Sequence, residues 1–178
     1  MPYYRFPGSI EIWNLQGGNE LTVAELSLRE TIPIGGVEIG KRRVNWQAQA
    51  PATLVWTEAL DQGDPNLDAD FRDQVYAWAA PFENEPKEVI KLEDRSIGGE
   101  WIEGTQQGLF YEDDRDERWM RFWLKDLASA ASLTAPARLM HERNYQDRYA
   151  DPGEPMTRTN PAGKEVVRLH DGNIFLRG

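Results

Sequence analysis

Bulky apolar residues recur at a fixed interval along this chain, and the interval constrains the fold more than any other feature. Trp46 and Trp101 are 55 residues apart, and Val55 and Phe110 are separated by the same interval. A related outline occurs three times, with a Trp about two-thirds of the way along a strand-like segment that runs into a turn, at residues 10–15, 75–82 and 120–126. A repeated unit of this length, built from short strands, is typical of a β-propeller.

Alternating apolar and polar residues, bounded by Gly, Pro, Asn and Asp, predict two successive sets of four strands. The first set is predicted at residues 43–47, 53–59, 74–80 and 88–92. The second set is predicted at residues 97–102, 109–111, 119–124 and 137–141. A hairpin of residues 8–15 and 21–28 precedes both sets, and a strand pair at 154–159 and 164–169 follows them.

Helical signals are weak throughout the chain. Residues 124–133 lack an apolar stripe at helical spacing and Pro136 closes them, so this stretch is interpreted as a long connection between strands. The predicted strand at 119–124 carries bulky residues on both faces, with Phe122 on one and Trp123 on the other. A sheet with one face in water would alternate more cleanly, so we expect sheets that are covered on both faces.

We therefore predict an all-β fold, an incomplete β-propeller with two full four-stranded antiparallel blades flanked by two half-blades. Residues 1–178 are predicted to form a single partial propeller. Its predicted parts are a half-blade at 6–30, a blade at 41–93, a blade at 95–142 and a half-blade at 151–178. Half-blades at both ends predict a fragment of a larger propeller, with unpaired strand edges. Because three blades would close a strained circle, we expect self-association through these edges rather than closure within one chain.

The composition limits the partners and the compartment. The chain has 178 residues, 40% of them apolar, and seven Trp, which favours a globular protein. Its formal net charge of −10 argues against a nucleic-acid or anionic-membrane partner. The sequence has no Cys, which excludes disulfides and thiolate metal sites. It contains neither a membrane-length apolar run nor a signal-peptide core, so we expect a cytoplasmic protein, or one of the plastid stroma if the source is a plant.

No catalytic residue is predicted. The chain has two His, His141 and His170, and a catalytic base needs a positioned nucleophile and an orienting acid. The sequence lacks a Gly-x-Ser-x-Gly elbow, which lifts a Ser into reach of its His. The serines, none of them in such a context, are Ser9, Ser27, Ser96, Ser129 and Ser132.

Acidic clusters are interpreted as solvated loops, and no metal or cofactor is predicted. The run of residues 112–117 is expected at a wet hairpin tip. A paired-carboxylate glycosidase site could be assembled from Glu58, Glu100 or Glu112, but carboxylates are too plentiful for this pattern to discriminate. Oxygen ligands suited to Ca²⁺ recur in one loop that lacks the Gly and the bidentate Glu of a calcium-binding loop; they belong to Asp64, Asp68, Asp70 and Asp73.

The seven Trp have two interpretations. Flat indole rings could line a sugar- or peptide-binding surface. Their strand spacing and repeat register favour packing between blades instead, so Trp46 and Trp101 are both expected to be largely buried. Trp56 and Trp119 are less regularly spaced and are the better candidates for exposure.

Several short motifs share the order and spacing of a known family. They are Arg43-Val44-Asn45-Trp46, residues 51–58, Gly63-Asp64, residues 72–76, Gly98-Gly99, and Asp151-Pro152-Gly153 followed by Met156. With these motifs, from about Arg5 to about Leu169, the chain resembles the amino-terminal propeller of the chloroplast-type glutamyl endopeptidases. Those are serine peptidases of the prolyl oligopeptidase family. The resemblance implies a multi-bladed propeller that caps an α/β-hydrolase domain, which cuts after acidic residues, mostly Glu.

The resemblance implies a non-catalytic propeller segment that gates or orients the access of peptides to a separate α/β-hydrolase domain. Because the elbow of that domain is not in this chain, the chain by itself is not expected to be an enzyme. The expected partners are the hydrolase domain of the parent peptidase and peptide. The alternative is a free-standing β-repeat protein that acts as an interaction or ligand-binding module. A neighbouring reading frame that encodes a hydrolase would discriminate between the two.

Overall fold

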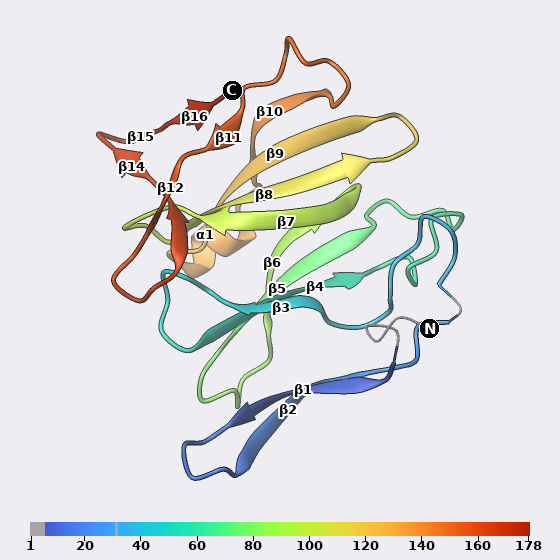
Figure 1. Ribbon diagram of the computed structural model, residues 1–178, viewed down its shortest axis with the longest axis vertical. Coiled ribbons are helices and arrows are strands. Elements are labelled where there is room, and N and C mark those ends of the chain that lie inside the picture. The colour runs from blue at the N-terminus through green and yellow to red at the C-terminus, as the bar shows by residue number, and fades with distance from the viewer. Residues whose placement is uncertain (1–5, 31) are drawn as a thin grey trace.

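Two four-stranded antiparallel sheets form the centre of the computed structural model, which describes residues 6–30 and 32–178 (Figure 1). Sheet 1 consists, in spatial order, of β3 (Arg42–Trp46), β4 (Thr53–Ala59), β5 (Asp73–Ala79) and β6 (Lys87–Leu92). Sheet 2 consists, in spatial order, of β7 (Arg95–Trp101), β8 (Gln107–Asp114), β9 (Trp119–Asp126) and β10 (Arg138–Asn144). The predicted all-β class with antiparallel four-stranded sheets is confirmed.

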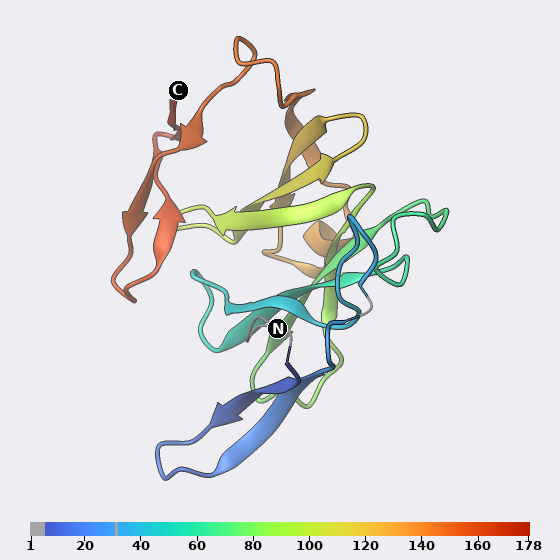
Figure 2. The ribbon, with the colours of Figure 1, turned by 45° about the vertical axis from the view of Figure 1, so that its right-hand side comes forward.

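Shorter strand pairs lie at the two ends of this pair of sheets (Figures 1 and 2). The N-terminal pair is a hairpin of β1 (Gly8–Trp13) and β2 (Asn19–Leu26). Residues 154–177, here called the C-terminal segment, form the pairs β11-β16, β12-β13 and β14-β15. Their bounds are β11 (Glu154–Pro155), β12 (Thr157–Thr159), β13 (Glu165–Val167), β14 (Leu169–His170), β15 (Asn173–Ile174) and β16 (Leu176–Arg177). In the described residues, the hairpin and the C-terminal segment belong to separate sheets.

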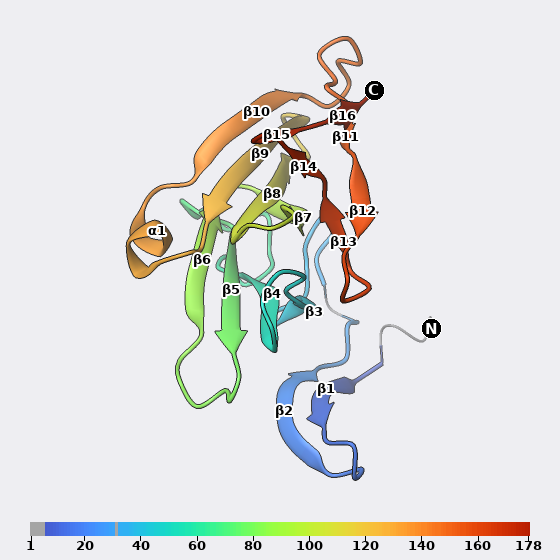
Figure 3. The same cartoon turned by 90° about the vertical axis from the view of Figure 1, so that its left-hand side faces the viewer.

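The hairpin, sheet 1, sheet 2 and the C-terminal segment follow one another along the molecule (Figure 3). Apolar side chains fill the three interfaces between them, so each four-stranded sheet is covered on both faces. Between the hairpin and sheet 1, Val23 packs with Leu54. Between the two sheets, Val75 and Ile90 pack with Phe110. Burial of such side chains is the main favourable contribution to folding. Between sheet 2 and the C-terminal segment, the buried residues are Ile102, Leu109 and Val167.

Lys41 fastens the hairpin to sheet 1. Its Nζ donates a hydrogen bond of 2.7 Å to the backbone oxygen of Val23 in β2. The same ammonium lies 4.8 Å from the ring centroid of Trp56 and 5.5 Å from that of Trp78. A cation over an indole face is attracted by the ring quadrupole, so Lys41 adds an electrostatic link to the apolar contacts of this interface.

The first strand of each sheet carries a β-bulge at an equivalent position. The β3–β4 register breaks between Arg42 and Asn45, and the β7–β8 register breaks between Ser96 and Gly98. Arg43 has a φ of 54° and Gly98 a φ of 137°. These two residues are 55 positions apart, so the interval seen in the sequence recurs in the backbone. Bulges re-aim the side chains next to them.

A buried carboxylate ties the two bulged strands to the interior strand β5. Asp73 is fully buried, and its Oδ1 accepts hydrogen bonds from Arg42 Nη2 at 2.5 Å and from Arg95 Nη1 at 3.0 Å. Its Oδ2 accepts from the backbone N–H of Ser96 at 2.8 Å. Both oxygens therefore accept hydrogen bonds from donors in β3 and β7, and a buried carboxylate needs such partners.

Asp61 extends this network through the loop between β4 and β5. Its Oδ2 accepts from Arg95 Nη2 at 2.5 Å and from Arg72 Nη1 at 2.8 Å. Burial alone would raise the pKa of Asp61, but the hydrogen bonds from Arg95 and Arg72 outweigh burial and hold the pKa below its usual value. The loop that resembled a calcium-binding site is thus held by arginine side chains.

The stretch predicted as a connection after β9 contains a short helix, α1 (Ala130–Thr134). Ser129 caps its N-terminus by accepting a hydrogen bond from the backbone N–H of Ser132. Lys125 of β9 donates to the backbone oxygen of Leu133 at 2.8 Å and to that of Ala135. Five residues are too few for an apolar stripe, so periodicity gives no signal for this helix.

The predicted burial of Trp46 and the predicted exposure of Trp56 are both wrong. Trp46 is 42% exposed, because it ends the edge strand β3. Trp101 is only partly exposed, because it packs edge-on against Phe110 with ring centroids 5.8 Å apart. Trp56 is 2% exposed because it lies on an interior strand beneath the hairpin.

Replacing the buried carboxylate should destabilise the fold. Asp73→Asn leaves Arg42 buried beside a neutral partner, so the free energy of unfolding should fall by about 3–5 kcal/mol. Urea denaturation measures this change. Asp68→Asn, at an exposed position of the nearby loop, is the control and should change stability by less than about 0.5 kcal/mol. Equal effects of the two substitutions would show that the ionic link contributes nothing specific.

The two misassigned Trp residues give a second stability test. Trp56→Ala should lower the free energy of unfolding by about 3–5 kcal/mol, because it empties a packed site between the hairpin and sheet 1. Trp46→Ala should lower it by a clearly smaller amount, since much of that ring already contacts water. Thermal melting of both variants checks the order, and a larger loss from Trp46→Ala would contradict this packing.

Candidate functional site

A cleft lies between sheets 1 and 2 beside their bulged strands, and we call it the β3–β7 cleft. It encloses about 280 Å³. Its walls come from five strands, β3, β4, β5, β7 and β8. The aromatic residues that line it are Trp46, Trp56, Trp101 and Phe110, and the polar ones include Arg43, Asn45 and Ser96.

Two glycines let the aromatic wall of this cleft form. A Cβ on Gly99 would lie 2.8 Å from the backbone oxygen of Leu109 and 3.0 Å from the Phe110 ring. A Cβ on Gly108 would lie 2.9 Å from the Phe110 ring and 3.2 Å from Trp101. Any larger residue at either position would push Phe110 out of its edge-on contact. The Gly98-Gly99 pair therefore has a packing role, in addition to the bulge conformation of Gly98.

Arg43 is the one charged residue among the described residues that line the β3–β7 cleft. Its bulge conformation sends the guanidinium across to β7, where Nη1 donates to the backbone oxygen of Ile97 at 3.1 Å. The charge of Arg43 affects the pKa of Asp113 in β8. Burial and Asp114 raise the pKa of Asp113 and Arg43 lowers it, and the net shift is upward.

A second cavity, of about 630 Å³, shares Arg43 and Ser96 with this cleft and continues toward the loops. Asp94, in the link between β6 and β7, is one of its lining residues. The Oδ2 of Asp94 accepts from Arg121 Nη1 at 2.7 Å, and its backbone N–H donates to Glu112 at 2.9 Å. Burial and the neighbouring Glu112 charge outweigh Arg121 and raise the pKa of Asp94 to about 6.

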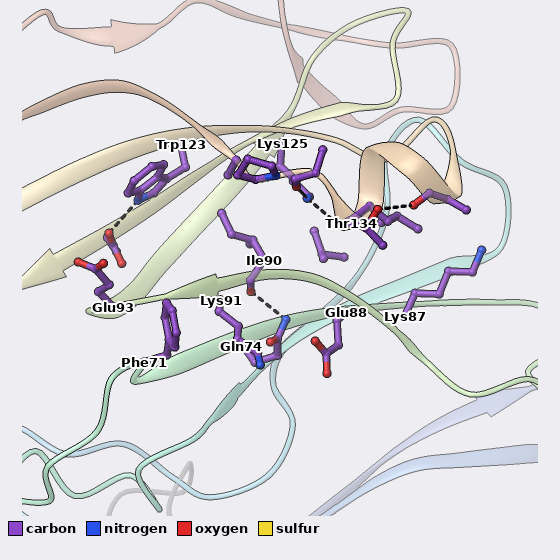
Figure 4. Close-up of a pocket in the computed structure, with 17 residues that line it drawn as sticks. Phe71, Gln74, Lys87, Glu88, Ile90, Lys91, Glu93, Trp123, Lys125 and Thr134 are labelled. Carbon is purple, nitrogen blue, oxygen red and sulfur yellow. Dashed lines mark hydrogen bonds between the residues drawn. The ribbon is translucent and has the colours of Figure 1, made fainter.

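A further cavity of about 820 Å³ opens at the outer side of the sheets, between β6 and α1 (Figure 4). Trp123 and Ile90 give it an apolar base, and charges of both signs surround it. Burial lowers the pKa of Lys125 in its wall, but the ammonium is already bound to the carbonyl oxygens after β9. This arrangement secures α1. The surrounding charges are those of Lys87, Glu88, Lys91 and Glu93.

The two histidines have contacts other than serines in the described residues. His141 of β10 packs against Phe122, with ring centroids 5.8 Å apart. His170 is exposed, and its Nε2 lies 3.4 Å from Asp171. Ser96 is buried, and the hydroxyl of Ser132 bonds to Ser129 and donates to Asp126. Within residues 6–30 and 32–178, none of the hydrogen bonds joins a Ser to a His.

The carboxylates considered for a glycosidase site each accept a hydrogen bond from an aromatic side chain instead. Glu58 accepts from Trp56 Nε1 at 2.7 Å, Glu100 from Tyr111 Oη at 2.6 Å, and Glu112 from Trp123 Nε1 at 2.7 Å. Burial and the bond to Glu100 raise the pKa of Tyr111. A buried indole N–H or phenol O–H needs such an acceptor, so these acids support the packing.

The residues considered for calcium binding make different contacts and do not act together. Asp64 accepts from the backbone and side-chain N–H groups of Asn66 in its own turn. Asp68 and Asp70 are exposed, and Asp73 belongs to the buried ionic network. In the part of the chain that the structure describes, no three His, Asp or Glu side chains gather as a metal-binding group. Asp114 at the β8–β9 tip likewise caps its own turn.

Among the described residues, no helix has the length and apolar character to cross a bilayer.

Two curated plant proteins align with nearly the whole chain. The chain is 36% identical over 171 residues to "Probable glutamyl endopeptidase, chloroplastic" of Arabidopsis thaliana. This alignment covers 94% of this chain and 17% of that protein. It is 33% identical over 183 residues to the protein of the same name from Oryza sativa subsp. japonica. That alignment covers 99% of this chain and 19% of the relative. The chain thus spans less than a fifth of the length of these relatives. The predicted resemblance to glutamyl endopeptidases is confirmed.

No protein-family model matches the chain. No solved structure matches it either.

The raised pKa of Asp94 predicts a distinctive pH dependence. A carboxyl whose pKa is about 6 when folded and 3.8 when unfolded binds protons more tightly in the folded state, so it stabilises the fold as pH falls. The free energy of unfolding of the parent, relative to Asp94→Asn, should therefore rise between pH 7 and pH 4, by about 1–3 kcal/mol. Urea denaturation at each pH measures the difference. A flat difference, as expected for exposed Asp68→Asn, would contradict the assignment.

Proposed function

We propose that this chain is a non-catalytic propeller segment of a glutamyl-endopeptidase-like serine peptidase, and that it orients peptides on their way to a separate α/β-hydrolase domain. The observation that carries this proposal is the alignment of 94–99% of the chain with 17–19% of each relative. Two proteins named as probable glutamyl endopeptidases thus include a homologous segment, and most of their length lies outside it. The chemistry is assigned to that remaining part.

The sheet architecture supports the propeller part of the proposal. Sheets 1 and 2 are both four-stranded, antiparallel and connected in sequence order, and they stack face to face through apolar contacts. Propeller blades have this organisation. On this basis we divide the chain into blades at 41–93 and 95–142, with half-blades at 6–30 and 151–178. The matching bulges at Arg43 and Gly98 support a common blade geometry.

The side-chain chemistry supports a role in contact rather than in catalysis. Acyl transfer by a serine peptidase requires a Ser whose proton a His can accept. The hydroxyl of Ser129 caps α1 instead, and the backbone N–H of Ser96 donates to Asp73. The segment would act in the compartment of its parent peptidase, which is the plastid stroma for a plant protein and the cytoplasm otherwise.

Segment exchange with a relative tests the proposal. In the Arabidopsis relative, the matched segment is replaced by this chain, or by a Gly/Ser linker of equal length as a control. The chimera should cleave a short Glu-containing peptide and discriminate against a large folded protein as the parent does, whereas the linker variant should lose that discrimination. This chain alone should show no turnover and no labelling by a serine-reactive fluorophosphonate. A folded chimera that cleaves neither substrate would contradict the proposal and favour a free-standing interaction module.

A further inference from the structure

We infer that the far face of sheet 2, which is turned away from sheet 1, binds the β1–β2 hairpin of a second copy of this chain. The contact is head-to-tail and closes a ring of two copies. It rests on how the described side chains pack and is independent of the proposed peptidase role. The closure at two copies rests on the proposed division into blades.

The repeated Trp outline of the sequence places side chains on the two faces of a strand in a fixed way. In β5, Val75 and Ala77 face sheet 2, where Trp123 packs against them. Trp78 of the same strand packs on the hairpin side of sheet 1. Since side chains alternate between the faces of a strand, this strand presents aliphatic residues to the layer after it and a Trp to the layer before it.

In β9 the aliphatic side of this outline lacks the cover that it has in β5. Met120 and Phe122 hold the positions of Val75 and Ala77, 45 residues further along the chain. Val75 is 3% exposed, whereas Met120 and Phe122 are only half-buried. A cavity of about 790 Å³ lies beside them, between sheet 2 and the C-terminal segment. Met120 and Phe122 also lie outside the apolar cluster that the C-terminal segment forms with sheet 2.

The hairpin has the complementary uncovered face. Ile10 and Ile12 pack toward sheet 1, and the alternate residue Trp13 is 57% exposed on the opposite face. In the repeated outline, Trp13 holds the place of Trp78 and Trp123, which both pack against the layer before them. Among the described residues no layer precedes the hairpin (Figure 3). A Trp that is exposed in this way is typical of the centre of an interface.

The two ends of the molecule supply different parts of one layer. The hairpin packs on β4 and β5 and leaves Trp46 of β3 42% exposed. The C-terminal segment packs on β7 and β8 and leaves part of β9 uncovered. Both lie at opposite ends of the molecule, so they do not combine within one chain (Figures 1 and 3). In a head-to-tail contact, the hairpin of one copy lies beside the C-terminal segment of the other, and together they cover both faces.

Two copies are enough to close this arrangement. A contact between two unlike surfaces gives a ring where the rotation closes and an open chain of copies where it does not. Two copies supply four full sheets and two composite layers, each made of one hairpin and one C-terminal segment. That is six blades, within the range of about four to eight that closed propellers have.

The charges of the two surfaces favour the same orientation. Residues 8–26 of the hairpin contain three Glu and neither Lys nor Arg. The wall of the cavity beside Met120 includes three cations and three acids, which are Arg143, Arg148, Arg177, Glu100, Asp151 and Glu154. Asp151 is paired with Arg143, and Glu100 accepts from a tyrosine hydroxyl. No ion pair of Arg148 or Arg177 is found in the described residues, so both are available to the Glu side chains of the hairpin.

Sedimentation of the full chain tests the inference. At micromolar concentration the parent should sediment with twice the mass of one chain. Trp13→Lys and Met120→Lys each remove one side of the contact, so each should raise the dissociation constant of the dimer at least about thirtyfold, as removal of a central interface residue does. Leu15→Lys is the control, at a fully exposed position of the same hairpin, and should leave the dissociation constant unchanged. Thermal melting should confirm that every variant is folded.

Mixing the two variants tests the head-to-tail orientation. Trp13→Lys retains an intact far face of sheet 2, and Met120→Lys retains an intact hairpin. An equimolar mixture should therefore form a heterodimer through one intact contact, although each variant alone is monomeric. Fluorescence energy transfer between differently labelled variants measures this association. A contact between two hairpins, or between two far faces, would not be restored by mixing.

A monomeric parent, an open-ended series of larger species, or a mixture of variants that stays monomeric would overturn the inference. An equal loss of association in Leu15→Lys and Trp13→Lys would do the same. These outcomes are separate from that of the segment exchange, which measures cleavage by a chimera. A monomeric chain whose chimera is functional would overturn the interface alone, and a dimer whose chimera is inactive would overturn the peptidase role alone.

Discussion

The carboxylate of Asp73 is the interaction on which the arrangement of the two sheets depends. It accepts hydrogen bonds from the residues that come directly before the two bulges, Arg42 in β3 and Ser96 in β7. Fixing these two residues fixes where Arg43 and Gly98 leave the regular strand path. The geometry of the cleft between the sheets therefore depends on the Asp73 carboxylate. A buried charge is costly to desolvate, so it needs hydrogen-bonding partners.

A second constraint comes from the pairing of aromatic donors with acids. Glu58, Glu100 and Glu112 satisfy N–H and O–H groups that packing would otherwise leave unpaired. Glu58 lies two residues from Trp56 on one strand, so the period of a strand places them on the same face. Glu112 and Trp123 meet only through the β8–β9 register. The first pairing can be predicted from sequence, and the second requires the register.

The strands and their grouping into fours could be predicted because alternation and turn residues are local signals. Burial of individual Trp residues could not, because it depends on what the next layer supplies. Trp46 ends an edge strand opposite Leu54 and is 42% exposed, whereas Trp101 packs edge-on against Phe110. The direction of the Arg43 side chain could not be predicted either, because a bulge sets it and strand alternation does not.

The meandering order of the strands has a consequence for how the chain acquires its structure. In both four-stranded sheets each strand pairs only with the strand before or after it in the chain. Such neighbour pairing keeps the sequence separation of contacts low, and low separation speeds folding. Sheet 1 can therefore assemble as soon as β6 has left the ribosome, and its exposed face then serves as the template on which the strands of sheet 2 settle as they are synthesised.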